Sequence, residues 1–186
     1  MIAIMSTMIQ RLLSMADAQV QIGPGQALFV TGAPVRSIYV VLEGSVRLVR
    51  HQASGAALVL QRAEANQLLA EASLFASRYH CDAVAEHGAR LARIPKTGIL
   101  DAQRKDAAWL ADLAAHLAGE VQCARARAEL LSLRTVRERV AAWTTLHGEF
   151  PARGHWIEVA QEIGVTPEAL YRELARAGRQ QEQSPE

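Results

Sequence analysis

The side chains best suited to chemistry in the first half of the chain are a histidine and a cysteine in direct succession, His80 and Cys81. A cysteine beside a histidine can ligate haem iron, or it can act as a redox-sensitive thiol because an imidazolium favours the thiolate. Neighbouring residues of a strand point to opposite faces, however, so one pocket does not easily take both side chains. We therefore favour a buried, inert Cys81. Haem binding and thiol redox sensing stay open as alternatives.

Other candidate ligands and nucleophiles are scattered along the sequence. Cys81 and Cys123 lie 42 positions apart, too few and too distant for a disulfide framework or a four-ligand zinc site. The remaining histidines show no metal spacing, and the His-x-His pair with a following glutamate that a jelly-roll metalloenzyme needs is absent. We expect no catalytic residues, no metal site and no cofactor.

Composition and charge narrow the class of protein. The chain has 186 residues, 50% hydrophobic and 21% charged, with a net charge of +1, which is typical of a globular protein with one large domain or a large and a small one. No apolar stretch reaches the 18 or so residues of a membrane span, and no secretion signal is evident, so we expect a cytoplasmic protein that does not enter the membrane. The near-neutral charge means that any contact with nucleic acid must be local.

The elements before residue 105 or so read as an all-β domain. Short runs of β-forming residues alternate with turn residues, and the pair Glu43-Gly44 between two such runs predicts a tight hairpin turn. Many short strands with regular turns indicate a sandwich or jelly roll. The predicted strands are Ala27–Val30, Ser37–Leu42, Ser45–Arg50, Ala57–Gln61, Asp82–Glu86 and Ala89–Ile94.

From Ala107 the spacing of apolar residues becomes helical and predicts one long helix of about 25 residues. Its apolar stripe consists of Leu110, Leu113, Leu117, Val121, Ala124, Ala128 and Leu131. Such a stripe either covers the β domain, as most amphipathic helices do, or forms a dimer interface. We favour the dimer interface because a helix of this length presents more apolar surface than one small sheet edge covers.

The C-terminal part contains a helix, a glycine turn and a second helix. A helix over Arg134–Leu146 and a loop over 147–154 come first, and a short helix over Trp156–Ile163 follows, which Gly164 ends in a left-handed conformation. Thr166 is a natural N-cap and Pro167 suits the first position of the next helix, which runs until Gly178. The pattern is typical of a helix-turn-helix. The residues expected to face inward are Ala160, Ile163, Val165, Leu170 and Leu174.

Four segments together carry a resemblance to a known family: the string Ile38–Leu48, the stretch Leu69–Phe75, the long helix, and Val159–Leu174. The chain resembles the Crp-Fnr superfamily of bacterial transcription regulators along nearly its full length. The resemblance implies an α+β protein with a jelly-roll-like β-roll of the cyclic-nucleotide-binding type at 1–106, a dimerisation helix at 107–133 and a helix-turn-helix DNA-binding domain at 134–186. It also implies a homodimer on a palindromic DNA operator, with a small-molecule effector of unknown identity.

The effector pocket departs from the family pattern. Members that bind cyclic nucleotides carry a Gly-Glu pair and an Arg-Ser or Arg-Thr pair at the phosphate, and here these positions hold Ala70-Glu71 and Cys81-Asp82. The guanidinium is missing and Asp82 would repel a phosphate, so we expect neither cyclic AMP nor cyclic GMP as the effector. Carried over by position, the pocket residues are Glu71, His80, Cys81 and Asp82. Glu71 either accepts a ribose hydroxyl or is a structural acid, which we favour. No N-terminal cysteine cluster is present for an iron–sulfur centre.

Carried over in the same way, Glu168 and Arg172 are expected to read bases, and Thr166 and Tyr171 to contact phosphates. Glutamate accepts from cytosine N4 and arginine pairs with guanine O6 and N7, so the two fit one G·C-rich frame. The alternative is that Glu168 is an acid favoured by the helix dipole and that Arg172 is a solvated surface residue.

Two features favour that alternative. The segment Arg134–Glu186 holds seven arginines and eight glutamates, whereas DNA-binding modules usually carry excess positive charge. Only eight residues follow Gly178, which predicts a truncated or absent wing, and the polar tail Arg179–Glu186 is expected to be disordered. The leading hypothesis is a homodimeric transcription regulator, and the alternative is an effector-binding or protein-interaction dimer of the same fold that does not bind DNA.

Overall fold

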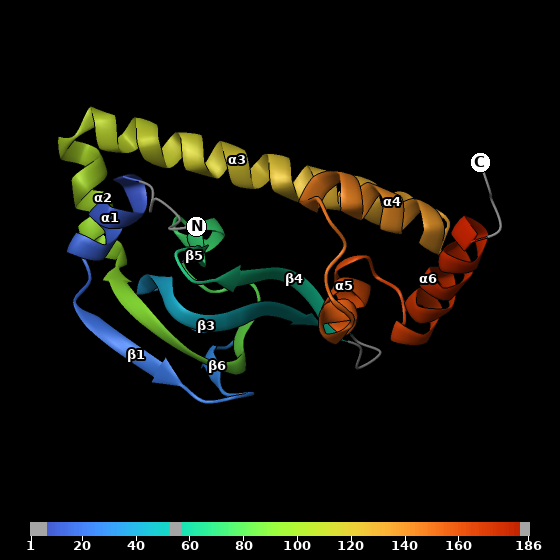
Figure 1. Cartoon of the computed structure of the whole chain (residues 1–186). Helices are drawn as coiled ribbons and strands as arrows, with labels where there is room; N and C mark the ends of the chain where they lie inside the picture. The colour runs from blue at the N-terminus through green and yellow to red at the C-terminus, as the bar shows by residue number, and fades with distance from the viewer. Residues whose placement is uncertain (1–6, 53–56, 183–186) are drawn as a thin grey trace. The chain divides into compact units, whose positions relative to one another are not determined.

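The N-terminal half of the chain forms one antiparallel sheet (Figure 1). The structure is a computed structural model, and it describes residues 7–52 and 57–182. The strand order is β1-β6-β3-β4, with β2 paired to β6 and β5 paired to β3. All the pairings are antiparallel, as in the β-roll expected from the sequence. The strands are β1 (Ala18–Ile22), β2 (Ala27–Phe29), β3 (Ser37–His51), β4 (Ala57–Glu64), β5 (Leu68–Leu69) and β6 (Asp82–Pro95).

Two long strands replace the predicted hairpin. β3 runs without a turn through Glu43 and Gly44, and β6 runs through Gly88. Gly44 has a φ of +77°, and the β3–β6 register shifts on either side of it, so the glycine bends the strand instead of reversing it. A Cβ at Gly44 would lie 2.0 Å from the Gly88 carbonyl oxygen. The hairpin prediction was wrong because a glycine at positive φ serves a bulge as well as a turn.

Three helical segments that the strand pattern did not predict accompany the sheet: α1 (Thr7–Ser14), the 3-10 turn η1 (Glu71–Ser73) and α2 (Lys96–Lys105). α1 buries Met8, Ile9 and Leu12, whose spacing of three to four residues is that of one helix face. Arg11 of this helix pairs with Asp106 and lies over the Trp109 ring, 5.4 Å from its centroid. These contacts hold α1 beside the end of α2, as Figure 1 shows.

The core of this first unit is continuous from the sheet to the start of α3 (Ala107–Ser132). Its strands supply Val40, Leu91 and Ile94, and α3 supplies Trp109 and Leu113, all almost inaccessible to solvent. Asp106 starts α3 by accepting a hydrogen bond from the Trp109 amide at 3.0 Å. The long helix therefore begins as part of the β-roll's own core.

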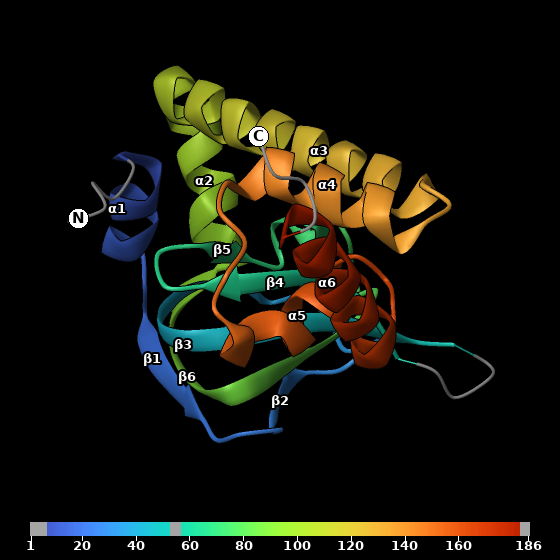
Figure 2. The ribbon, with the colours of Figure 1, turned by 45° about the vertical axis from the view of Figure 1, so that its right-hand side comes forward.

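The second unit is helical. It comprises α4 (Val136–His147), the 3-10 turn η2 (Arg153–His155), α5 (Trp156–Glu162) and α6 (Pro167–Glu182). A capping box between Thr135 and Glu138 starts α4. Figure 2 shows α4, α5 and α6, coloured orange to red, gathered together. Their small core buries Leu130, Trp143, Val159, Ala160, Ile163 and Leu170.

The chain divides into two compact units, Met1–Ala118 and Gly119–Glu186, with the boundary inside α3. The sequence predicted three segments according to their expected functions: 1–106, 107–133 and 134–186. The division into compact units does not test these functional boundaries, which stay a prediction. One helix boundary was wrong: α6 does not stop at Gly178 but continues to Glu182, so the first part of the predicted disordered tail is helical. Residues 183–186 lie outside the described residues.

Candidate functional site

The turn between α5 and α6 has the geometry predicted from the sequence. Gly164 has a φ of +65°, and the Val165 amide donates to the Ala160 carbonyl at 2.9 Å, which closes the end of α5. The Thr166 hydroxyl accepts a hydrogen bond from the Ala169 amide at 3.2 Å, as an N-cap does. The five predicted inward residues all belong to the core of this unit or pack against it. The described residues thus contain a helix-turn-helix.

A side chain that the sequence did not single out fixes this turn. The Arg139 guanidinium of α4 donates to the carbonyls of Ile163 and Gly164, at 2.9 and 3.1 Å. It also donates to the carbonyls of Leu131 and Leu133, at 3.0 and 2.9 Å. Four backbone acceptors at the ends of two helices are satisfied by one cation. The sequence around Arg139 does not show whether its side chain binds backbone carbonyls or faces solvent, because arginines of both kinds occur in amphipathic helices.

The face of α6 directed to solvent carries Glu168 and Arg172, both exposed. Backbone and Thr166 hydrogen bonds at the start of α6 lower the pKa of the Glu168 carboxyl, and nearby Arg172 lowers it further. Glu168 is therefore ionised at neutral pH and beside a cation. Thr166 is exposed but uses its hydroxyl in the cap, so its structural role is established whatever else it contacts. Tyr171 is half-buried and packs on Trp156, with ring centroids 5.1 Å apart.

The predicted effector residues do not converge on one pocket. Cys81 is 1% exposed and lies in the core, whereas His80 is exposed and its Nδ1 lies 3.2 Å from the Ser73 hydroxyl. Burial raises the pKa of the Cys81 thiol, and the exposed Arg50 of β3 opposes that rise. The strand alternation assumed for this pair was wrong, because β6 begins only at Asp82, but the two side chains nevertheless lie in different environments. A buried thiol with a raised pKa is a poor nucleophile and a poor metal ligand.

Asp82 is turned toward a neighbouring loop. Its Oδ1 accepts hydrogen bonds from the amide and the hydroxyl of Thr31, at 2.6 and 2.7 Å, and these bonds lower the pKa of its carboxyl. Its Oδ2 lies 3.4 Å from His51 Nε2. The carboxylate is therefore part of the internal hydrogen bonding of the roll. The expected repulsion between this carboxylate and a phosphate stays a prediction.

The segment that precedes Glu71 is strained. Ala70 has a φ of +72°, in the left-handed region that glycine adopts without a steric penalty. The alanine in place of the family's glycine therefore occupies a glycine-type backbone conformation. Glu71 follows it, buried in η1. A buried acid in a turn of this kind matches the structural role that we favoured, and its contact with a ribose stays untested.

The predicted stripe on α3 is divided between two environments. Leu113 is 1% exposed in the core of the first unit, Leu117 packs against that core, and Leu131 packs against the core of the second unit. The exposed members are Leu110, Val121, Ala124 and Ala128. The prediction of one continuous interface face was wrong for Leu113 in particular, since that side chain is already buried within its own chain. Only the exposed members remain available to a partner.

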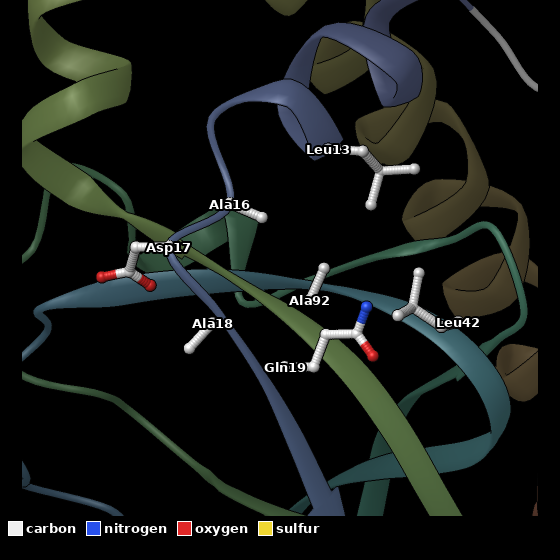
Figure 3. Close-up of a pocket in the computed structure, with 7 residues that line it drawn as sticks. All are labelled: Leu13, Ala16, Asp17, Ala18, Gln19, Leu42 and Ala92. Atoms are coloured by element: carbon white, nitrogen blue, oxygen red, sulfur yellow. The ribbon is translucent and has the colours of Figure 1, made fainter.

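One surface pocket of about 480 Å³ lies where α1 meets the sheet (Figure 3). It is lined by Leu13, Ala16, Asp17, Ala18, Gln19, Leu42 and Ala92. The Asp17 carboxylate is held by the Arg93 guanidinium, at 2.9 and 3.2 Å, and the Gln19 amide oxygen accepts a hydrogen bond from Arg90 at 3.0 Å. None of the lining residues is cationic, so the pocket is not suited to a phosphate.

A charged cluster lies on the strands β3, β4 and β6. Glu86 accepts hydrogen bonds from Arg62 and Ser45, at 2.9 and 3.0 Å, and its carboxylate lies 3.3 Å from Arg47. These partners outweigh the cost of burial and lower the pKa of the Glu86 carboxyl. Glu86 pairs with both arginines at once and offsets one of their two charges, and these ion pairs within the sheet indicate a structural network.

Within the described part of the chain, no group of three or more histidine, cysteine or acidic side chains is placed to hold a metal ion. In the same residues, no helix is long and apolar enough to span a membrane.

Comparison with known proteins agrees with this architecture. A family model described as the cyclic nucleotide-binding domain matches residues 19–106. No curated protein matches the sequence.

Solved structures are similar over most of the chain. FixK2 from Bradyrhizobium japonicum has a TM-score of 0.74 at 19% identity, covering 88% of this chain and 85% of its own. The c-di-GMP-responsive global regulator CLP of Xanthomonas campestris has a TM-score of 0.70 at 18% identity, covering 93% and 91%. A CRP/FNR-family transcriptional regulator from Thermus thermophilus has a TM-score of 0.64 at 28% identity, covering 87% of each chain. Residues 19–106 therefore resemble the cyclic nucleotide-binding domain, and the chain as a whole has the fold of the CRP/FNR transcriptional regulators.

Proposed function

We propose that the chain is a cytoplasmic homodimeric transcription regulator that binds a palindromic DNA operator through α6 and is not itself an enzyme. The observation that carries the proposal is the exposed Arg172 on the second helix of a fully capped helix-turn-helix. Among the described residues, none forms a hydrogen bond with this guanidinium, so its donors are available to guanine O6 and N7. Glu168, one turn earlier, is ionised and suited to accept from cytosine N4.

The dimer is proposed to form through the exposed residues of α3. Val121 is 48% exposed and Leu110 46%, and the exposed alanines Ala124 and Ala128 would let two helices approach closely. Val121→Asp places a charge at such a seam and should shift the protein to monomers in sedimentation velocity. Leu117→Asp is a poorer test, because Leu117 also packs against the core of its own chain. A Val121→Asp protein that stays dimeric would contradict this interface.

The test of DNA binding is selection of a duplex from a random pool with the purified protein, followed by binding of the selected site and a scrambled site. Arg172→Ala should cost about 1–3 kcal/mol of discrimination between the two sites, since one bidentate base contact is lost. Arg137→Ala, which removes an exposed arginine of α4, is the matched control. Failure of the pool to enrich, or unchanged discrimination by Arg172→Ala, would contradict base reading by α6.

The effector is proposed not to be a cyclic nucleotide. Cys81 is buried and Asp82 is bonded to Thr31, so neither position offers the phosphate a cation. Loss of a charge-assisted contact and gain of a like charge should cost a few kcal/mol, enough to turn micromolar affinity into millimolar. Calorimetry against cyclic AMP, cyclic GMP and c-di-GMP tests this, and a micromolar dissociation constant for any of them would contradict it. Arg50, the exposed cation near Cys81, would then be the first residue to replace.

A second candidate function, a protein-interaction dimer of the same fold, is favoured by one observation. From Arg134 to Glu186 the chain carries seven arginines against eight glutamates, so this segment has no excess of positive charge. The two candidates differ in salt dependence. Affinity for duplex DNA falls steeply with added salt when phosphates are contacted, whereas the alternative predicts no binding to the duplex at any salt concentration.

A further inference from the structure

A stack of one arginine on two aromatic rings lies beside the exposed face of α6. The guanidinium carbon of Arg153, in η2, is 5.9 Å from the centroid of the Trp156 ring and 5.7 Å from that of Tyr171. The two rings contact each other at 5.1 Å, and the Trp156 indole N–H donates to the Pro151 carbonyl at 2.9 Å. Figure 2 shows α5 and α6, the helices that carry these rings, next to each other. The loop before α5 and the start of α6 are thus joined by one cationic stack.

The stack orders the guanidinium but leaves its donors available. A cation–π contact uses the face of the planar group, while its N–H groups point outward in the plane, where they can bind phosphate oxygens in a bidentate manner. Arg153 is exposed, and within the described residues no carboxylate forms an ion pair with it. Glu158 of α5 instead lies 3.0 Å from the His155 ring. The site therefore presents a fixed cation that has no anion.

Its position relative to Arg172 suggests what the anion is. Tyr171 and Arg172 are successive residues of α6, so their side chains leave the helix about 100° apart. The stacked Arg153 consequently lies on the flank of the surface that carries Glu168 and Arg172, not within it. When an exposed helix face enters the major groove, the sugar–phosphate backbone runs along its flanks.

We propose that Arg153, held by Trp156 and Tyr171, is a phosphate clamp that binds the DNA backbone beside the groove entered by α6. The inference rests on the proposed DNA binding and adds a sequence-independent contact to the reading by Arg172. It also gives the neutral C-terminal unit a local source of affinity, which its net charge does not supply.

The test uses the full-length protein and a labelled mixed-sequence duplex of about 40 base pairs, because a phosphate contact does not depend on sequence. The logarithm of the binding constant is measured against the logarithm of the KCl concentration for the unaltered protein, Arg153→Ala, Arg153→Lys and the control Arg137→Ala, an exposed arginine of α4. One phosphate contact per subunit contributes about 0.9 to the slope, so Arg153→Ala should make the slope of a dimer shallower by about 1.8. Arg153→Lys keeps the charge and should keep most of the slope, with lower affinity because the planar stack is lost.

Each outcome decides the inference. A shallower slope for Arg153→Ala alone, with thermal unfolding unchanged, supports the clamp. Equal slopes for the unaltered protein and Arg153→Ala would show that the stack serves only packing, while DNA binding itself stands. An equal change in Arg137→Ala would assign the effect to net charge and overturn the clamp. No binding of the duplex by the unaltered protein would overturn the clamp together with the proposed function.

Discussion

The β-roll and the helical C-terminal unit differ in whether the predicted site residues are already engaged within the fold. At the predicted effector site of the roll, Asp82 is bonded to Thr31, His80 contacts Ser73, and Cys81 is buried. In the helical unit, Arg153 and Arg172 are exposed and lack acidic partners at ion-pair distance in the described residues. Residue type alone therefore does not identify a binding site. A side chain is available to a ligand only where the fold has not already used its hydrogen-bonding capacity.

The two units also fix their irregular backbone in different ways. The roll brings two strands together at a glycine where no side chain fits, Gly44 against Gly88. The helical unit instead fixes its turn with a side chain, the Arg139 guanidinium, that binds four carbonyls. We therefore expect the roll to tolerate backbone changes least and the helical unit to depend on individual polar contacts.

The largest expected effect is that of Gly44→Ala. The new Cβ would lie 2.0 Å from the Gly88 carbonyl oxygen at a φ of +77°, so β3 and β6 must separate locally. The free energy of unfolding should fall by about 3 kcal/mol or more, measured by urea denaturation. Gly32→Ala is the matched control, since Gly32 has a φ of +83° but no atom within 4 Å of the added Cβ. The free energy of unfolding of Gly32→Ala should therefore fall by only about 1 kcal/mol, which is the cost of the backbone strain.

Equal losses for the two glycine variants would contradict the close approach at Gly44 and assign both effects to backbone conformation. The same pair explains why the strands were misjudged from the sequence. Glu43-Gly44 has the local composition of a hairpin turn, and only its pairing with Ala89 across the sheet shows that the chain continues. Long-range pairing leaves no signature in the local sequence.

The helix-turn-helix was predictable because its determinants are local. Gly164, Thr166 and the apolar spacing act within one or two turns of helix, and the structure confirms each. The α3 stripe was only partly predictable. Its periodicity gave the helix correctly, but nothing in the spacing tells Leu113, buried in the roll, from Val121, which is exposed. Periodicity identifies an apolar face, and the tertiary partner of that face depends on contacts far along the chain.

The next largest effect is expected for Arg139→Gln in the helical unit. The glutamine amide cannot reach the four carbonyls that the guanidinium binds, and charged hydrogen bonds of this kind contribute about 1.5–3 kcal/mol. We expect a loss of about 2–3 kcal/mol that is confined to residues 119–186, measured by amide hydrogen exchange. Arg137→Gln changes an exposed arginine of the same helix and should stay within about 0.5 kcal/mol of the unaltered protein. Uniform loss of protection in the roll as well would contradict the local role of Arg139.

A smaller effect separates the two roles considered for Thr166. As the N-cap of α6, its hydroxyl should contribute about 1 kcal/mol, which Thr166→Ala removes and Thr166→Ser retains. Both variants are measured by thermal unfolding and by the salt dependence of duplex binding. We expect the stability of Thr166→Ala to fall while its slope in salt stays that of the unaltered protein. A shallower slope with unchanged stability would instead make Thr166 a phosphate contact, as first expected from the family resemblance.

The smallest effect is a pH dependence of the roll that comes from Asp82. The Thr31 hydrogen bonds lower the pKa of the folded carboxyl below its unfolded value of about 3.9, so the folded state favours the ionised form. The stabilisation is complete above that unfolded value and is lost as the pH falls through the folded pKa. Asp82→Asn should therefore be less stable than the unaltered protein by about 1 kcal/mol or less at pH 7, and the difference should close as the pH falls below about 4. Urea denaturation of both proteins from about pH 2.5 to about pH 7 measures it. If the difference in unfolding free energy between the two proteins stays constant over this range, the contacts that hold Asp82 do not depend on its charge. The contrast with the exposed charges of α6 would then be one of hydrogen bonding alone.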